Sequence, residues 1–278
     1  MDLNARCVAA LEAVLAPLRP IVADVRVGVF YTAVRLDTGH AGVAFTPRDL
    51  ADTVCCPRSA AQAPPAGSVA GRDAWELAAY AQSRVPLRRA IGVAVINALS
   101  ALAMQQHGVP GGRKVPDLDA LEAAGVHASD RVAMVGAFTP FIKALKGRVA
   151  RLRVIDRHKE ALKPDEHDLW CDPAQAAAAL ADADIAIITG SAQIEGGLEA
   201  LLGAARGARS VVLAGPTASG WPTPYFERGV HVLAGIEILD PERILRVVSE
   251  GGSGYFFEGA ARKVCLVRDP PAVRAATG

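Results

Sequence analysis

Small and hydroxyl-bearing residues follow the strands expected in the C-terminal half of the chain, and their types suit contact with a ligand. They come after three of the four strands expected at residues 131–136, 151–155, 184–189 and 210–214, the exception being the strand at 151–155, which Asp156 follows. Ligands of open α/β sheets bind beyond the carboxyl ends of the parallel strands, where the strand order reverses. The alternative is that the glycines only form tight strand-to-helix turns. As a set, the loops predict a ligand crevice that contains Gly136, Phe138, Thr139, Pro140, Asp156, Thr189, Gly190, Ser191, Gly215 and Pro216.

The turn after the first of these strands lacks the dinucleotide fingerprint Gly-x-Gly-x-x-Gly. Phe138 stands where a second glycine would admit a pyrophosphate. Asp156 ends the second strand, 20 residues after Gly136, where a ribose-binding carboxylate would lie. That carboxylate can equally close a turn, so NAD is disfavoured, while another small organic cofactor remains open.

Cysteine and histidine side chains form two candidate metal sites. His158, His167 and Cys171 lie in one polar segment, and His167 and Cys171 would share a face if that segment were helical. Cys55 and Cys56 are adjacent, so both could bind one metal only through a special loop geometry. Thiolates and imidazoles suit transition metals such as Fe, Ni, Co or Zn. The alternative for the polar segment is a solvated loop, because neither Cys-x-x-Cys nor His-Glu-x-x-His occurs.

Asn97 is a polar residue inside the apolar run of residues 90–104. A buried amide must find hydrogen-bond partners, so Asn97 either anchors the core or faces a cleft between domains. The chain has no Walker motif and no Gly-x-Ser-x-Gly elbow between a strand and a helix. Whether it is an enzyme therefore stays open.

The elements that position these residues alternate between strands and helices from residue 131 onward. Near-continuous apolar strands at this spacing predict an α/β fold with a mostly parallel sheet covered on both faces. A further strand is expected at residues 230–235, and residues 263–268 suit a final edge strand. Four cap-proline pairs predict helix starts at Thr139-Pro140, Asp172-Pro173, Thr223-Pro224 and Asp240-Pro241.

The N-terminal part has a different pattern, typical of a small α+β domain. Residues 109–117 hold prolines and glycines and are the best linker candidate, which divides the chain into domains 1–110 and 111–278. Before the linker we expect an amphipathic helix at 3–18, an antiparallel hairpin from strands 22–36 and 42–45, and helices at 75–82 and 87–107.

Composition and charge limit the kinds of partner and the cellular location expected for this protein. The 278 residues are 51% hydrophobic with a net charge of +1, so no strong field favours nucleic acid or an anionic membrane. No apolar run reaches the roughly 18 residues of a membrane span, and the first residues do not resemble a signal peptide. Five scattered cysteines indicate reduced thiols in a cytoplasm. We expect a cytoplasmic homo-oligomer with a small-molecule or metal ligand, and without nucleic-acid or membrane partners.

Nearly the whole chain, residues 5–268, resembles a family of Rossmann-like domains named for heavy-metal chelation, in which an enolase-N-terminal-like domain comes first. The resemblance is carried by residues 42–44, 90–99, 135–142, 183–190, 210–216, 226–235 and 240–252. It implies a small enolase-N-terminal-like cap on a Rossmann-like sheet, with a ligand cleft between them. It also implies that the cleft holds a transition metal or a metal chelate.

Three hypotheses follow. The leading one is metal handling in the interdomain cleft. The second is an enzyme or sensor that binds a pterin, a nucleotide or an adenosyl compound on the strand-end loops. The third is a non-catalytic assembly module, which would bind a protein partner and no small ligand.

Overall fold

The computed structural model describes residues 2–47 and 63–270, and this part of the chain forms two β-sheets. The smaller sheet is antiparallel and has the order β1-β2-β3, with β1 at Val22–Val27, β2 at Tyr31–Leu36 and β3 at Ala41–Phe45. The larger sheet has eight strands in the order β4-β11-β10-β9-β8-β5-β6-β7. Its strands are β4 (Gly112–Pro116), β5 (Arg131–Val135), β6 (Arg151–Ile155), β7 (Trp170–Cys171), β8 (Ile185–Thr189), β9 (Ser210–Ala214), β10 (Val232–Ile238) and β11 (Ala261–Arg268).

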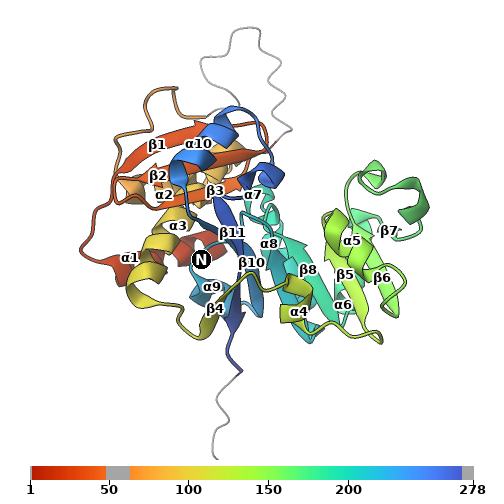
Figure 1. Cartoon of the computed structure of the whole chain (residues 1–278). Helices are drawn as coiled ribbons and strands as arrows, with labels where there is room; N and C mark the ends of the chain where they lie inside the picture. The colour runs from red at the N-terminus through yellow and green to blue at the C-terminus, as the bar shows by residue number, and fades with distance from the viewer. Residues whose placement is uncertain (1, 48–62, 271–278) are drawn as a thin grey trace, which may run out of the picture.

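The helices connect and cover these strands. Figure 1 shows the small sheet at one end of the molecule, beside α10, and the edge formed by β6 and β7 at the other. The α-helices are α1 (Leu3–Leu15), α2 (Ala74–Ala78), α3 (Pro86–His107), α4 (Ala120–Ala124), α5 (Thr139–Leu145), α6 (Ala176–Ala181), α7 (Ala192–Glu195), α8 (Leu198–Ala204), α9 (Pro222–Glu227) and α10 (Pro241–Ser249). The 3-10 helices are η2 (Ala79–Gln82), η3 (Lys159–Ala161), η4 (Pro164–Glu166), η5 (Pro173–Gln175), η6 (Ala205–Gly207) and η7 (Gly254–Phe257).

The larger sheet is mostly parallel, which confirms the predicted α/β fold class. Strands β5 to β10 pair in parallel, while β11 is antiparallel to both β10 and β4. The chain runs outward from β5 through β6 to β7 and then crosses back to β8 on the other side of β5. The strand order therefore reverses between β5 and β8, which is the switch point where open α/β sheets bind ligands.

The predicted long strand at residues 22–36 is wrong in its extent, because the chain turns back at residues 28–30 and forms the two antiparallel strands β1 and β2. Gly28 allows a close approach to α10 at this turn: a Cβ atom there would lie 2.2 Å from the Val248 carbonyl oxygen. The predicted antiparallel pairing with residues 42–45 is confirmed as β2–β3.

Helix α3 is the central element of the N-terminal part. Fourteen of its 22 residues are buried, and it packs on β2, β3 and η2. Its length and composition would suffice to cross a membrane, but 78% of the apolar window is buried inside the fold, as in the core helix of a globular protein. One hydrophobic core joins this helix to residues of β5, β8 and β9, so the N-terminal elements and the large sheet pack as one body.

The predicted linker at residues 109–117 contains the edge strand β4, which pairs with β11. The sequence did not indicate a strand there, because prolines and glycines flank it and only two of its five positions are even partly buried. The strand shows that the polypeptide enters the larger sheet shortly after α3 ends. The division of the chain at residue 110 stays a prediction.

Two of the four predicted helix caps are confirmed. The Asp172 carboxylate accepts a hydrogen bond from Ala174 N at the start of η5, and Asp240 caps α10 through Arg243 N. The other two are wrong by one or two residues. Phe138 and Trp221 occupy the cap positions of α5 and α9, so Thr139 and Thr223 lie inside the first turn.

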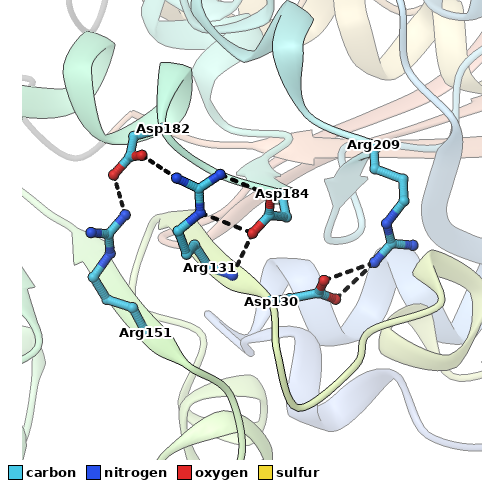
Figure 2. A network of polar contacts seen from close by, with 6 residues as sticks. All are labelled: Asp130, Arg131, Arg151, Asp182, Asp184 and Arg209. Atoms are coloured by element: carbon cyan, nitrogen blue, oxygen red, sulfur yellow. Dashed lines mark hydrogen bonds and ion pairs between the residues drawn. The ribbon is translucent and has the colours of Figure 1, made fainter.

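Arginine and aspartate side chains join the amino ends of the central strands (Figure 2). Arg131 at the start of β5 donates to both carboxylate oxygens of Asp184, from Nε at 3.0 Å and from Nη2 at 2.9 Å. Asp182 accepts from Arg131 and from Arg151 at the start of β6. The Arg131 hydrogen bonds hold the pKa of Asp184 well below its ordinary value of 3.8. The network thus ties three neighbouring segments of the sheet at the edge opposite the switch point.

We expect the Asp184→Asn substitution to lower the melting temperature at pH 7, because it removes the carboxylate that Arg131 binds. A folded-state pKa below the unfolded one stabilises the protein above the unfolded pKa, and this stability is lost as pH falls toward the folded pKa. The difference from wild type should therefore be constant above pH 5 and shrink below about pH 4. Thermal unfolding between pH 3 and 8 measures it. The control is Glu12→Gln, which removes the same charge from an exposed position on α1. If both variants lowered the melting temperature equally and independently of pH, this would contradict the role assigned to Asp184.

Candidate functional site

A cavity of about 450 Å³ lies between the N-terminal elements and the larger sheet. Its walls come from the turn before β3, from β3 and α3 on one side, and from β4, β10, β11 and the turn after β9 on the other. Much of the lining is apolar and includes Val43, Met104, Leu233, Ile236 and Leu266. The polar side chains in the wall are Thr38, His40, Asn97, Gln105, Lys114, Ser219 and Glu237. This volume and this mixture of surfaces suit a small organic ligand.

Asn97 joins the two halves of the cavity. It is only 2% exposed, and its Nδ2 donates to the carbonyl oxygens of Val43, at 2.8 Å, and Thr217, at 3.0 Å. Both partners can only accept, so the amide nitrogen must face them and Oδ1 must point elsewhere. Oδ1 is buried and accepts no hydrogen bond from any residue in the described part of the chain. Asn97 therefore has a buried acceptor without a protein donor beside the cavity, and neighbouring atoms cover this acceptor.

The elements around Asn97 are held together by close backbone contacts. A Cβ atom on Gly42 of β3 would lie 2.3 Å from the Ala94 carbonyl oxygen of α3, so only glycine allows this approach. Phe45 N donates to Thr217 Oγ1 at 2.9 Å, which ties β3 to the turn after β9. Ser219 Oγ in the same turn accepts from Ile236 N at 3.0 Å and fixes the turn against β10.

Three charged side chains meet on the β4, β10 and β11 side. Glu237 accepts from Lys114 Nζ at 2.5 Å and from Arg262 Nε at 2.6 Å. Burial alone would raise the pKa of Glu237, but the hydrogen bonds from Lys114 and Arg262 outweigh it and lower the pKa below its ordinary value. Glu237 is therefore ionised at neutral pH, and two cations share one carboxylate, which leaves a net charge of +1.

His40 lies in the wall opposite this charged group, in the turn before β3. Its Nε2 is 2.8 Å from Gln105 Oε1, and its Nδ1 is 3.1 Å from Thr38 Oγ1. Because Gln105 Oε1 can only accept, Nε2 donates to it, while the Thr38 hydroxyl can donate to Nδ1 or accept from it. Both ring nitrogens thus have partners within the protein.

The predicted strand-end residues meet in part at the switch point. A Cβ atom on Gly136 (φ 94°) would lie 3.2 Å from Thr189 Cβ and 3.5 Å from Phe138 Cε2. The other edge of the Phe138 ring faces Gly215, whose Cβ would lie 3.9 Å from Phe138 Cε1. Thr189 Oγ1 and Ser191 Oγ are 3.1 Å apart. The Phe138 ring thus lies over the ends of β5 and β9, where a phosphate group would approach the backbone.

The remaining predicted residues lie around this group. Gly190 packs against the turn after β9, where a Cβ atom on Gly190 would lie 3.0 Å from Ala218 N. Pro216 lies close to Gly254. Thr139 and Pro140 are exposed in the first turn of α5. The Asp156 carboxylate accepts from Ala137 N and His158 N, both at 3.0 Å, so it closes the strand-end loop.

The candidate metal ligands are not brought together in the described residues. No group of three or more His, Cys, Asp or Glu residues there could hold a metal ion. His167 ends η4 and Cys171 lies in β7, so the two do not share a helical face. Cys171 Sγ is 3.6 Å from Gln175 Oε1, and His158 is exposed. Cys55 and Cys56 lie outside the described residues.

The sequence indicated Asn97 as a site residue but not His40, Lys114, Ser219, Gly235 or Glu237. These residues come from strands and turns far apart in the chain, and no local pattern places them on one cavity. The only usable signal was Asn97 itself, a polar residue within an apolar helix.

Comparison with known proteins identifies relatives over nearly the whole chain. Residues 7–100 match the family model DUF4213 and residues 119–267 match DUF364, and both are described as "Putative heavy-metal chelation". An uncharacterised protein of Methanocaldococcus jannaschii is 26% identical over 183 residues, which are 65% of this chain and 66% of that protein, just under two thirds of its length.

Two solved structures have a similar fold, and both are of DUF364 proteins with unknown function. The protein from Pyrococcus horikoshii has a TM-score of 0.76 at 21% identity, over 96% of this chain and 100% of the other. The protein from Desulfitobacterium hafniense has a TM-score of 0.73 at 19% identity, over 95% and 99%. At these identities the similarity establishes the fold alone.

Proposed function

Because the chain belongs to the DUF364 family, whose description is heavy-metal chelation, we propose that it binds a transition metal in the form of a small metal chelate. The chelate would occupy the cavity that Asn97, Lys114 and Glu237 line. Its organic part, and not the protein, would supply most of the ligands to the metal. Metal and chelator together are the cargo of this site.

The side chains of the cavity favour a chelate over a bare ion. A bare transition metal needs several imidazole, thiolate or carboxylate ligands at one point. In the described part of the chain no such group occurs, and within the cavity His40 and Glu237 already have partners. An ammonium group and apolar walls are instead the groups that recognise an organic molecule.

The observation that carries this proposal is the lining of the cavity, where the partly buried ammonium group of Lys114 lies on the same cavity as apolar side chains such as Val43 and Leu233. An organic chelator can match both kinds of surface, whereas a bare ion can match neither.

A thermal-shift panel tests the proposal. Fe, Ni, Co and Zn would be added as aquo ions and as complexes with aminopolycarboxylates, hydroxycarboxylates and amino acids, with the metal-free chelators as controls. At a hundred times the dissociation constant, a bound chelate should add about 2.7 kcal/mol, or about 5–10 °C in a chain of this size. The proposal is wrong if bare ions bind in stoichiometric amounts and chelates do not, or if no chelate in the panel raises the melting temperature.

The switch point supports a second candidate, an organic cofactor such as a pterin, a nucleotide or an adenosyl compound. Gly136, Thr189 and Ser191 leave small side chains at the ends of β5 and β8, and the partly exposed Phe138 ring offers a surface for stacking. NAD remains disfavoured, because that ring lies where a pyrophosphate would approach. A cofactor bound here should lose its thermal shift in a Gly136→Val variant, whereas a chelate in the Asn97 cavity should keep its own.

A further inference from the structure

The charges of the cavity point to the chemical class of the ligand, an inference that rests on the function proposed above. We propose that the ligand carries a carboxylate, which binds at Lys114. The ligand is thus an anionic chelate and not a neutral or cationic one.

The anionic end follows from the side chains of three adjacent strands. The Glu237 carboxylate on β10 accepts from Lys114 on β4 through one oxygen and from Arg262 on β11 through the other. One carboxylate neutralises one cation, so the group keeps a net positive charge at neutral pH. Of the three N–H donors of the Lys114 ammonium, Glu237 uses one.

Partial burial strengthens the attraction of this net positive charge for an anion. The side chains of Lys114 and Glu237 are 32% and 27% exposed, so solvent screens their charges less than it screens a freely exposed pair. Both residues line the cavity, whereas Arg262 supports Glu237 from the neighbouring strand. A second carboxylate, brought by the ligand, would balance the excess charge.

The rest of the ligand faces apolar side chains such as Val43 and Leu233, which line the same cavity. The ligand is therefore anionic at one end and apolar beside it.

Two nickel complexes of equal size test the inference: nickel nitrilotriacetate and nickel nitrilotriacetamide, in which each carboxylate is replaced by an amide. The full chain would be titrated with both by calorimetry. We expect wild type to bind the carboxylate complex at least about tenfold more tightly, with an affinity that falls as salt rises. Lys114→Gln should remove this preference and should not weaken binding of the amide complex, which is a cation.

Lys263→Gln is the matched control, because Lys263 is an exposed residue of β11 that does not line the cavity. It removes the same charge and should keep the preference. Equal affinity of wild type for both complexes would overturn the carboxylate assignment and leave the proposed function standing. Equal weakening of both complexes by Lys114→Gln would assign Lys114 a structural role and overturn it as well. If neither complex binds and the wider panel also gives no shift, the proposed function itself fails.

Discussion

Replacement of Gly42 by alanine will lower the free energy of unfolding by about 3 kcal/mol or more. The added Cβ atom would lie 2.3 Å from the Ala94 carbonyl oxygen, 2.4 Å from Ala98 N and 2.8 Å from the Asn97 carbonyl carbon. All three are backbone atoms of α3, so no side-chain rotation can relieve the contact. The small sheet must move away from the helix, and the cavity between them must change shape. Urea unfolding followed by circular dichroism measures the loss.

Gly203 provides the control for this substitution. It lies exposed within α8, and a Cβ atom there would meet nothing within 4 Å. Gly203→Ala should be neutral or stabilise the protein by about 0.5–1 kcal/mol, because alanine favours a helix interior. A Gly42→Ala protein as stable as Gly203→Ala would show that β3 and α3 are not in the contact described.

The second large effect is expected from Asn97→Ala, at about 2–4 kcal/mol of unfolding free energy. The substitution leaves the carbonyl groups of Val43 and Thr217 buried without their donor, and each such group costs about 1–3 kcal/mol. Removal of the unpaired Oδ1 offsets part of this cost. The variant should also lose the chelate-dependent thermal shift, because Asn97 Nδ2 ties β3 to the turn after β9 and both segments line the cavity.

Ser100→Ala on the same helix is the matched comparison. Ser100 is equally buried, but its hydroxyl donates to Ile96 O within α3 and joins no other element. Its loss should cost no more than about 1 kcal/mol and should leave ligand binding intact. Wild-type chelate affinity in Asn97→Ala would contradict the role assigned to the amide, whatever its effect on stability.

Much of the architecture could be predicted because the relevant signals are local. Apolar strands that alternate with helices fixed the parallel sheet, and the Asp172 and Asp240 caps marked helix starts. The cap-proline pattern wrongly predicted Thr139 and Thr223 as helix caps, because a threonine before a proline can lie inside the first turn as well as at the cap. Strand β4 was missed because an exposed edge strand needs few apolar residues.

The candidate site was less predictable because it depends on how distant elements are brought together. Asn97 could be identified from its apolar surroundings alone. Lys114, Glu237 and Arg262 meet only because β11 inserts between β4 and β10, an order that no local pattern encodes. Asp156 shows the converse: its position suggested a ribose ligand, while its carboxylate accepts from one backbone amide of its own loop and from one of the loop after β5.

The most direct test of the central claim is anomalous X-ray diffraction at the nickel edge, from crystals of the full chain grown with saturating nickel nitrilotriacetate. The account predicts one strong peak inside the cavity, with a chelator carboxylate near Lys114. The chelator should supply most of the nickel ligands. A peak bound directly by three or more protein side chains, or a cavity without nickel at saturation, would contradict the proposal that this protein carries its metal as a chelate.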